Sequence, residues 1–244
     1  MGPTDLKTES DAGKVPADRR PIASRSWGVF RHAAAWLTHS GVTPNAISAS
    51  SMVFAALAGA AFWATSRVED PVVLRLCWIA GGVLVQLRLI ANLLDGMVAV
   101  EGGKGSPSGP LFNEAPDRVA DACILLGAGW AAGSTPWLGA GATIVAVFVA
   151  YARALGASVG AGQVFSGPMA KPQRMAVVTG VAAAEAAALV SLSMERRLGF
   201  GLMSIALAAI LVGGLVTAVR RLAEISRRLH AAADGDPDEG AGEP

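Results

Sequence analysis

Charged residues are scarce in this chain of 244 residues. They make up 16% of it, against 52% hydrophobic residues, and the mean hydropathy is +0.46. A soluble domain carries about 25% charged residues. The composition therefore excludes an ordinary soluble protein and indicates one embedded in lipid. A net charge of +1 gives no reason to expect nucleic acid as a partner.

Cysteine and histidine are scarce as well. Cys77 and Cys123 lie within apolar runs, which excludes a disulfide framework and favours small buried side chains. The three histidines, His32, His39 and His230, lack the spacing of metal ligands, and we expect them at the surface. A metal site in this chain would therefore depend on oxygen ligands.

Both ends of the chain are polar. Residues 1–20 contain no apolar stretch typical of a signal peptide, and residues 229–244 are rich in glycine and acidic residues. We expect two disordered cytoplasmic tails. Residues 21–40 alternate apolar side chains with Arg and His, which predicts an amphipathic helix in the headgroup layer. A short soluble lead-in is the alternative for this segment.

Six apolar segments have the length of membrane spans, which need about 20 mostly apolar residues. Thr43 and Pro44 are typical of the N-cap and first residue of the first span. The second exceeds the ~30 Å hydrocarbon core, so its last turns should lie at or beyond an interface. We predict an all-α bundle of six transmembrane helices within residues 41–228, with spans at 44–65, 71–100, 114–133, 136–161, 175–192 and 200–221.

Lys and Arg residues indicate how the bundle is oriented, because they favour the cytoplasmic side. An even number of spans places both termini on that side. The opposite loops carry only Arg67, Arg196 and Arg197. The cytoplasmic segments carry Arg19, Arg20, Arg25, Arg31, Lys104, Arg118, Lys171, Arg174, Arg220, Arg221, Arg227 and Arg228.

Three aspartates interrupt the apolar pattern. Asp95 lies on one helical face with Asn92 and Gly96, and Asp117 and Asp121 share a face of the next predicted helix. The glycine-rich segment between the helices allows the two faces to meet. Converging carboxylates repel one another unless a cation lies among them, and oxygen ligands favour Mg²⁺, Mn²⁺ or Ca²⁺. The alternative for the second pair is a solvated helix start that suits the macrodipole.

This stretch resembles the signature of the CDP-alcohol phosphatidyltransferase family. The signature reads Asp, two residues, Asp-Gly, two residues, Ala-Arg, eight residues, Gly, three residues, Asp, three residues, Asp. Laid on without a gap, it matches at Asp95, Gly96, Ala99, Gly109 and Asp117. Further motifs extend the resemblance over about residues 42–174: Thr43-Pro44-Asn45, Tyr151-Ala152-Arg153, Lys171 and Arg174.

The chain departs from the signature at three positions. Asn92 and Asn113 stand where the family has aspartates, and Val100 where it has arginine. A rival register, which inserts four residues, makes Asp117 and Asp121 the last pair but loses the match at Gly109. Asp121 would otherwise supply the carboxylate that Asn113 lacks.

The resemblance implies a bacterial inner-membrane enzyme of phospholipid biosynthesis, with a homodimer as its expected assembly. Such an enzyme transfers a phosphatidyl group from a CDP-linked lipid to an alcohol and releases CMP, with Mg²⁺ or Mn²⁺, expected as two ions. The implied metal ligands are Asp95, Asp117, Asp121, Asn92 and Asn113. The base is Asp117 or Asp121, according to the register. The implied nucleotide contacts are Asp95, Gly96, Ala99 and Asn45, and those to an acceptor phosphate are Arg153, Lys171 and Arg174.

Several alternatives remain beside this reading. The protein could keep the fold and bind nucleotide, lipid or metal without turnover, given its three departures. It could be a small cation transporter, although carboxylates at helix ends disfavour this. Arg153 could be structural, and Lys171 and Arg174 only markers of topology. Arg88, one turn before Asn92, could be a charge partner of Asp95.

Overall fold

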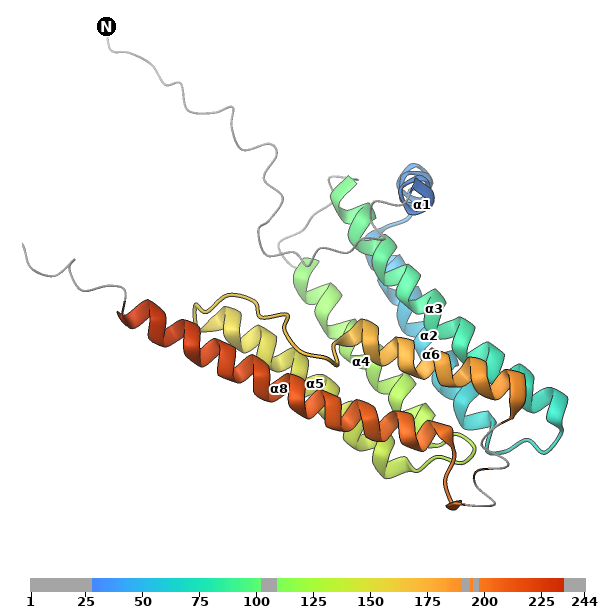
Figure 1. The fold of residues 1–244 in the computed structure, drawn as a ribbon. Coiled ribbons are helices and arrows are strands. Elements are labelled where there is room, and N and C mark those ends of the chain that lie inside the picture. The colour runs from blue at the N-terminus through green and yellow to red at the C-terminus, as the bar shows by residue number, and fades with distance from the viewer. Residues whose placement is uncertain (1–27, 102–108, 190–193, 195–197, 235–244) are drawn as a thin grey trace, which may run out of the picture.

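The computed structural model describes residues 28–101, 109–189, 194 and 198–234. This part of the chain is helical and contains no strand, which confirms the all-α class. Figure 1 shows the long helices packed side by side, with α1 outside them at one end. The helices are α1 (Gly28–His39), α2 (Pro44–Ala64), α3 (Pro71–Glu101), α4 (Gly109–Gly129), α5 (Pro136–Ser158), α6 (Lys171–Ala188) and α8 (Leu202–Asp234).

The six long helices fall where the six spans were predicted, yet only part of the span count is confirmed. Among the described helices, α2, α3, α5 and α8 are long and apolar enough to cross a membrane. The other two carry more charge: α4 contains Glu114, Asp117, Arg118 and Asp121, and the 18-residue α6 contains Lys171, Arg174 and Glu185. Their place in a membrane remains a prediction.

Several predicted boundaries need correction. Helix α4 begins at Gly109 rather than at residue 114 and ends at Gly129 rather than at residue 133. Helix α6 begins at Lys171 rather than at residue 175, because Pro172 occupies its first turn, where the missing N–H of proline costs nothing. Helix α8 continues to Asp234, so the helix extends past Arg228 into the segment predicted as a tail. Several predictions concern residues outside the described part of the chain. These residues are the rest of both predicted tails, residues 21–27, Lys104, Arg196 and Arg197.

Side-chain caps fix the start of the first two long helices. The Thr43 Oγ1 accepts a hydrogen bond from the Ala46 N–H at 3.3 Å, with Pro44 in the first turn, as predicted. The Asp70 carboxylate caps α3 by accepting from the N–H groups of Val72 and Val73, at 2.9 and 3.0 Å. Such caps satisfy backbone donors that have no partner within the helix.

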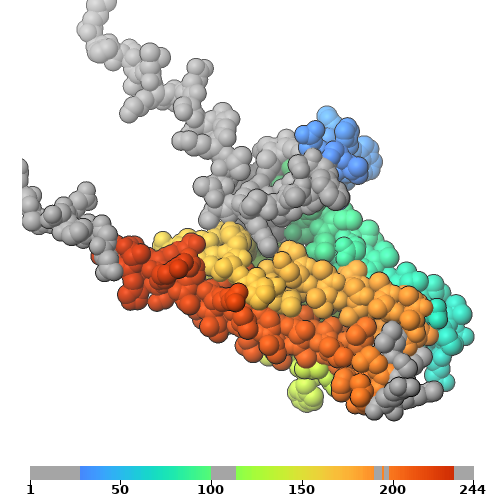
Figure 2. All heavy atoms as spheres, viewed as in Figure 1, coloured from blue at the N-terminus to red at the C-terminus, as the bar shows by residue number. Residues whose placement is uncertain are grey.

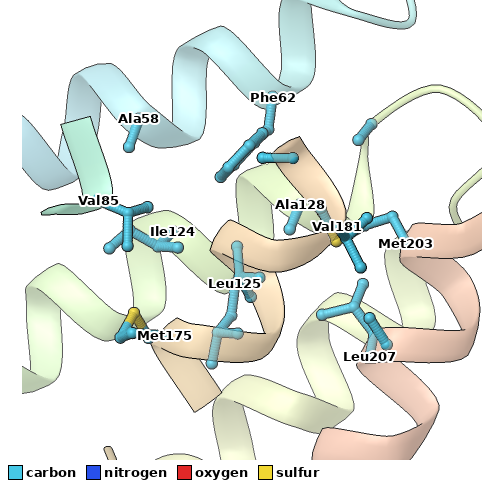
Figure 3. Packing of buried hydrophobic residues seen from close by; sticks show 14 of the residues in the cluster. Ala58, Phe62, Val85, Ile124, Leu125, Ala128, Met175, Val181, Met203 and Leu207 are labelled. Atoms are coloured by element: carbon cyan, nitrogen blue, oxygen red, sulfur yellow. The ribbon is translucent and has the colours of Figure 1, made fainter. Parts of the chain in front are cut away.

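The main core lies among α2, α3, α4, α5, α6 and α8. Figure 3 shows Phe62, Val85 and Ile124 directed into it from three different helices, and all three are buried. Phe62 also packs against Trp78, with ring centroids 5.9 Å apart. On the side shown in Figure 2, α8 and α6 form a continuous strip along the molecule.

Glycine lets α2 and α4 touch backbone to backbone. A Cβ atom on Gly127 would lie 2.3 Å from the Cα of Gly59, and a Cβ on Gly59 would lie 2.3 Å from the Cys123 carbonyl oxygen. No real side chain fits at such distances. The contact lies between one and two turns after Asp121 on α4, so it fixes how close the carboxylates of α4 come to α2 and α3.

Helix α1 packs on the ends of α2 and α3 through a small apolar cluster. Ala34 is buried against Ile47 and Ala91, whereas Val29 and Trp36 remain exposed. Figure 1 shows α1 nearly end-on while the long helices run across the view. The exposed apolar side chains are what an interfacial helix would present to lipid.

Candidate active site

Six charged side chains from three helices meet in the interior of the bundle. The α3, α4 and α6 helices each contribute two: Arg88 and Asp95, Asp117 and Asp121, and Lys171 and Arg174. All but Lys171 are buried. Buried charges are costly unless they are paired, so the positions of these partners define the site.

Arg88 lies at the centre of the cluster. Its Nη2 atom donates to the Asp117 Oδ1 at 3.1 Å and to the Asp121 Oδ1 at 2.9 Å, and it lies 3.3 Å from the Asp117 carbonyl oxygen. The side chain is fully buried. Since Asp117 and Asp121 are one turn apart on α4, a single guanidinium from α3 bridges both.

The remaining oxygens of these two aspartates bind α6. Arg174 Nη2 donates to the Asp121 Oδ2 at 2.8 Å, and Lys171 Nζ donates to the Asp117 Oδ2 at 2.6 Å. Arg174 is buried, but 21% of the Lys171 side chain is exposed. Asp121 is therefore held by two buried arginines, whereas one oxygen of Asp117 is held by a cation that can reach solvent.

Asp95 has a different environment. Its Oδ2 accepts a hydrogen bond from the Ser48 hydroxyl at 2.6 Å, and its buried Oδ1 has no hydrogen-bond partner among the described residues. Sequence reasoning missed Ser48, although it lies one turn after Asn45 on the same helix. The predicted pairing of Arg88 with Asp95 is wrong, because Arg88 reaches across to α4 instead.

Glu114, a second residue that sequence reasoning missed, holds the edge of the site. Its carboxylate accepts from both Arg153 of α5 and Arg118 of its own helix. Glu114 precedes Asp117 by three residues and Asp121 by seven, so all three lie on one face of α4. This helical spacing could have identified Glu114 as a site residue from the sequence.

The other predicted residues lie around this cluster. Asn45 is exposed at the start of α2, and Asn92, Gly96 and Ala99 are half-buried on α3. Each of the three predicted phosphate-binding cations contacts a carboxylate: Arg153 with Glu114, Lys171 with Asp117 and Arg174 with Asp121. The side chains of Asn113 and Val100 lie outside the described part of the structure.

The donors fit a hard divalent cation only in part. Asp95 offers a buried carboxylate oxygen without a partner, which is the kind of ligand that Mg²⁺ and Mn²⁺ prefer. However, the described residues contain no group of three His, Cys, Asp or Glu side chains placed to hold a metal ion. In addition, cationic side chains bind both aspartates of α4. The cluster fits an ion at Asp95 better than a pair of ions.

Comparison of the sequence with known proteins finds a relative that matches part of the chain. No family model matches the chain. A bifunctional IPC transferase and DIPP synthase of Rubrobacter xylanophilus is 38% identical over 120 residues, which is 48% of this chain and 25% of the relative. The chain thus spans about a quarter of the length of that protein.

The fold is similar to solved structures of the phosphatidylinositol phosphate synthase of Mycobacterium tuberculosis. A complex with manganese and citrate aligns with a TM-score of 0.65 at 18% identity, covering 81% of this chain and 88% of that one. A structure with CDP-DAG bound gives a TM-score of 0.61 at 19% identity, over 81% and 93% of the two chains. Sequence and fold together confirm that this chain resembles the CDP-alcohol phosphatidyltransferases.

Proposed function

We propose that this protein transfers a phosphatidyl group from a CDP-linked lipid to an alcohol and releases CMP. The observation that carries the proposal is the burial of the two signature aspartates, Asp95 and Asp117, in one bundle, where Lys171 of α6 binds Asp117. The names of the similar proteins support the same reaction class. In the reaction, the alcohol oxygen bonds to the phosphatidyl phosphorus, and the bond from that phosphorus to CMP breaks.

Asp117 is the better candidate for the base that takes the alcohol proton. Each oxygen of Asp121 accepts a hydrogen bond from a buried arginine, so both oxygens are held by fixed cations. Within the described residues, the Oδ2 of Asp117 is bound only by Lys171, whose side chain is partly exposed. If Lys171 turns toward an acceptor phosphate, this oxygen becomes free to accept the proton.

Asp95 and the neighbouring Asn92 would hold Mg²⁺ or Mn²⁺, through the free Oδ1 and an amide oxygen. When bound, such an ion neutralises the diphosphate and the charge that develops on the leaving CMP. Ser48 keeps the Asp95 carboxylate in one orientation, as outer hydrogen bonds do around metal ligands. The half-buried Gly96 and Ala99 would leave room for the nucleotide beside α3, with Asn45 at its rim.

An apolar cavity supports a lipid as the donor. It has a volume of about 330 Å³ and lies between α1, α2 and α3. Ile47 and Leu94, which line it, directly adjoin Ser48 and Asp95 in the sequence. An acyl chain in this cavity would bring the diphosphate of the donor next to Asp95. The full lining is Leu37, Val42, Ala46, Ile47, Ser50, Phe54, Leu87, Ile90, Ala91 and Leu94.

The acceptor is proposed to be a phosphorylated alcohol. Lys171 and Arg153 are partly exposed cations at the edge of the cluster, and a phosphate is a ligand that could replace their carboxylate partners. Arg174 is buried against Asp121, so it would act on the acceptor phosphate through its positive charge rather than by direct contact. The phosphatidylinositol phosphate product named for the structural relative is compatible with such an acceptor.

We also propose that the protein acts as a homodimer in a bacterial cytoplasmic membrane, with the site and both termini facing the cytoplasm. The distribution of Lys and Arg supports this orientation. Crosslinking in native membranes and labelling of single introduced cysteines on either side would test assembly and orientation.

Release of CMP from CDP-diacylglycerol tests the function. The purified protein in lipid nanodiscs would receive Mg²⁺ or Mn²⁺ and a panel of free and phosphorylated alcohols. We expect metal-dependent CMP release that one alcohol stimulates and that Asp117→Asn abolishes, whereas Arg75→Gln, an exposed change on α3, leaves it intact.

A second candidate is a protein that binds nucleotide, lipid or metal without turnover. The pairing of both α4 aspartates with cations favours it, since neutralised carboxylates bind ions and protons less well. Retained binding of CDP-diacylglycerol without CMP release, for every alcohol in the panel, would establish this alternative.

A further inference from the structure

The charges of the cluster balance without any added ion. The cluster contains three carboxylates, Asp95, Asp117 and Asp121, and three cationic side chains, Arg88, Lys171 and Arg174, which pair with Asp117 and Asp121. Repulsion between converging carboxylates is the usual reason for divalent ions to bind among them. Here the protein itself supplies most of the compensating charge.

The cations differ in how permanently they are bound. Lys171 is partly exposed and can leave Asp117, but Arg88 is fully buried and Arg174 nearly so. Moving a buried guanidinium to make room for an ion would leave it without its carboxylate partners, which is costly. Arg88 is therefore a fixed component of the site.

The position of Arg88 is that of a bridging ion. Its Nη2 atom lies within 3.1 Å of oxygens from both Asp117 and Asp121, so one positive centre binds two carboxylates. Its Nε and Nη1 atoms are buried without a hydrogen-bond partner among the described residues. The group is placed by its contact with the aspartates rather than by a full set of hydrogen bonds.

The neighbouring residues agree with this role. Asn92 lies one turn beyond Arg88 on α3 and carries no charge, although the signature has an aspartate there. Asn113 makes the same change on α4. A site with two asparagines in place of the signature aspartates and with a buried guanidinium attracts fewer cations. Asp95 remains as the carboxylate with a free buried oxygen in the described structure.

Taking the need for a divalent ion from the proposed function, we propose that Arg88 replaces one ion of a two-ion centre. The guanidinium holds Asp117 and Asp121 in place, and a single divalent ion binds at Asp95. This differs from the two ions that the family resemblance implies.

The test is the number of Mn²⁺ ions bound per chain, measured on the full-length protein in nanodiscs by the electron paramagnetic resonance signal of free Mn²⁺. We expect a single ion for the wild-type chain, its loss in Asp95→Asn, and a second ion in Arg88→Met. Arg88→Lys, which keeps the charge, should bind as the wild type does. Arg75→Met removes an exposed arginine from the same helix and serves as the matched control.

Two ions on the wild-type chain would overturn the proposal, as would none. So would a folded Arg88→Met that still binds a single ion. If that variant does not fold, Arg88→Gln, which still donates hydrogen bonds to the aspartates, is expected to gain the second ion instead. Because no substrate is present, the ion count is independent of CMP release. A single ion without CMP release would refute the proposed function and leave the role of Arg88 intact.

Discussion

Arg174 and Asp121 form an ion pair of 2.8 Å between Nη2 and Oδ2, and both side chains are almost completely buried. Arg88 binds the other oxygen of the same carboxylate at 2.9 Å. One aspartate on α4 thus joins α3 to α6. Removing a partner from such a buried arrangement leaves uncompensated charge, which is more damaging than loss of a surface pair.

Asp121→Asn should therefore destabilise the fold by about 3–5 kcal/mol, because two buried arginines would lose their shared carboxylate. The change preserves the shape of the side chain, so a loss of stability reports the charge. Thermal unfolding in detergent, followed by tryptophan fluorescence, measures it. Arg227→Gln, which breaks an exposed pair with Glu224, should leave the melting temperature unchanged. Equal melting of the two variants would show that the buried pairs contribute nothing.

Gly127→Ala should destabilise the bundle by about 1–3 kcal/mol, as overpacking does. The new methyl group would meet the backbone of Gly59 and force α2 and α4 apart. Gly180→Ala is the matched control, since nothing lies within 4 Å of its Cβ position and alanine favours helix more than glycine. We expect that control to melt at the same or a higher temperature. If Gly127→Ala also did so, the close helix contact would be disproved.

Ser48→Ala should weaken binding of Mn²⁺ by about 10–100-fold, because the hydroxyl that orients Asp95 would be lost. Isothermal titration of the protein in nanodiscs gives the dissociation constant. Ser50→Ala, on the same helix, removes a hydroxyl that donates only to the Ile47 carbonyl oxygen, and should leave the affinity unchanged. A matching loss in both variants would point to a general effect on α2 rather than on Asp95.

Asn92→Asp should raise the affinity for Mn²⁺ and the rate of CMP release. It returns a carboxylate to the position one turn before Asp95, where the signature has one. Initial rates at limiting and saturating Mn²⁺ separate the effect on binding from that on turnover. CMP release that stays absent in Asn92→Asp even at saturating metal would favour binding without turnover as the function of the protein.

Thr43→Ala should cost about 1 kcal/mol, because the side chain caps the first turn of α2. Thr135 precedes α5 in the equivalent position but makes no side-chain cap bond, so Thr135→Ala should cost less. Unfolding monitored by circular dichroism compares the two. A larger effect at Thr135 would contradict the assignment of the cap.

The sequence predicted the helices well where apolar periodicity and capping residues agree. The start of α2 is determined locally by Thr43 and Pro44, and the start of α5 by Pro136 after a turn. Helix ends were predicted less well: α8 continues to Asp234 because nothing in residues 222–234 breaks a helix, although the composition there is polar.

The chemistry of the site was only partly predictable. Spacing along a helix identified Asp95, Asp117 and Asp121 as residues that share faces, and the structure buries all three. Which cation binds which carboxylate depends on the packing of α3, α4 and α6, and no local pattern contains that information. Arg88 illustrates the limit, since its distance from Asn92 along α3 suggested Asp95, whereas the bundle directs it to Asp117 and Asp121.

The length of α8 has a mechanical consequence. Its 33 residues extend about 50 Å at 1.5 Å per residue, which exceeds the ~30 Å hydrocarbon core by several turns. On its later turns, Arg221 donates to the carbonyl oxygens of Val149 and Ser166, and Arg228 donates to that of Ala161. These hydrogen bonds tie the later turns of α8 to residues 161–166, the segment that leads into Lys171. A displacement of the C-terminal end of α8 would therefore be passed on, through these hydrogen bonds, to the segment before Lys171, the lysine that binds Asp117.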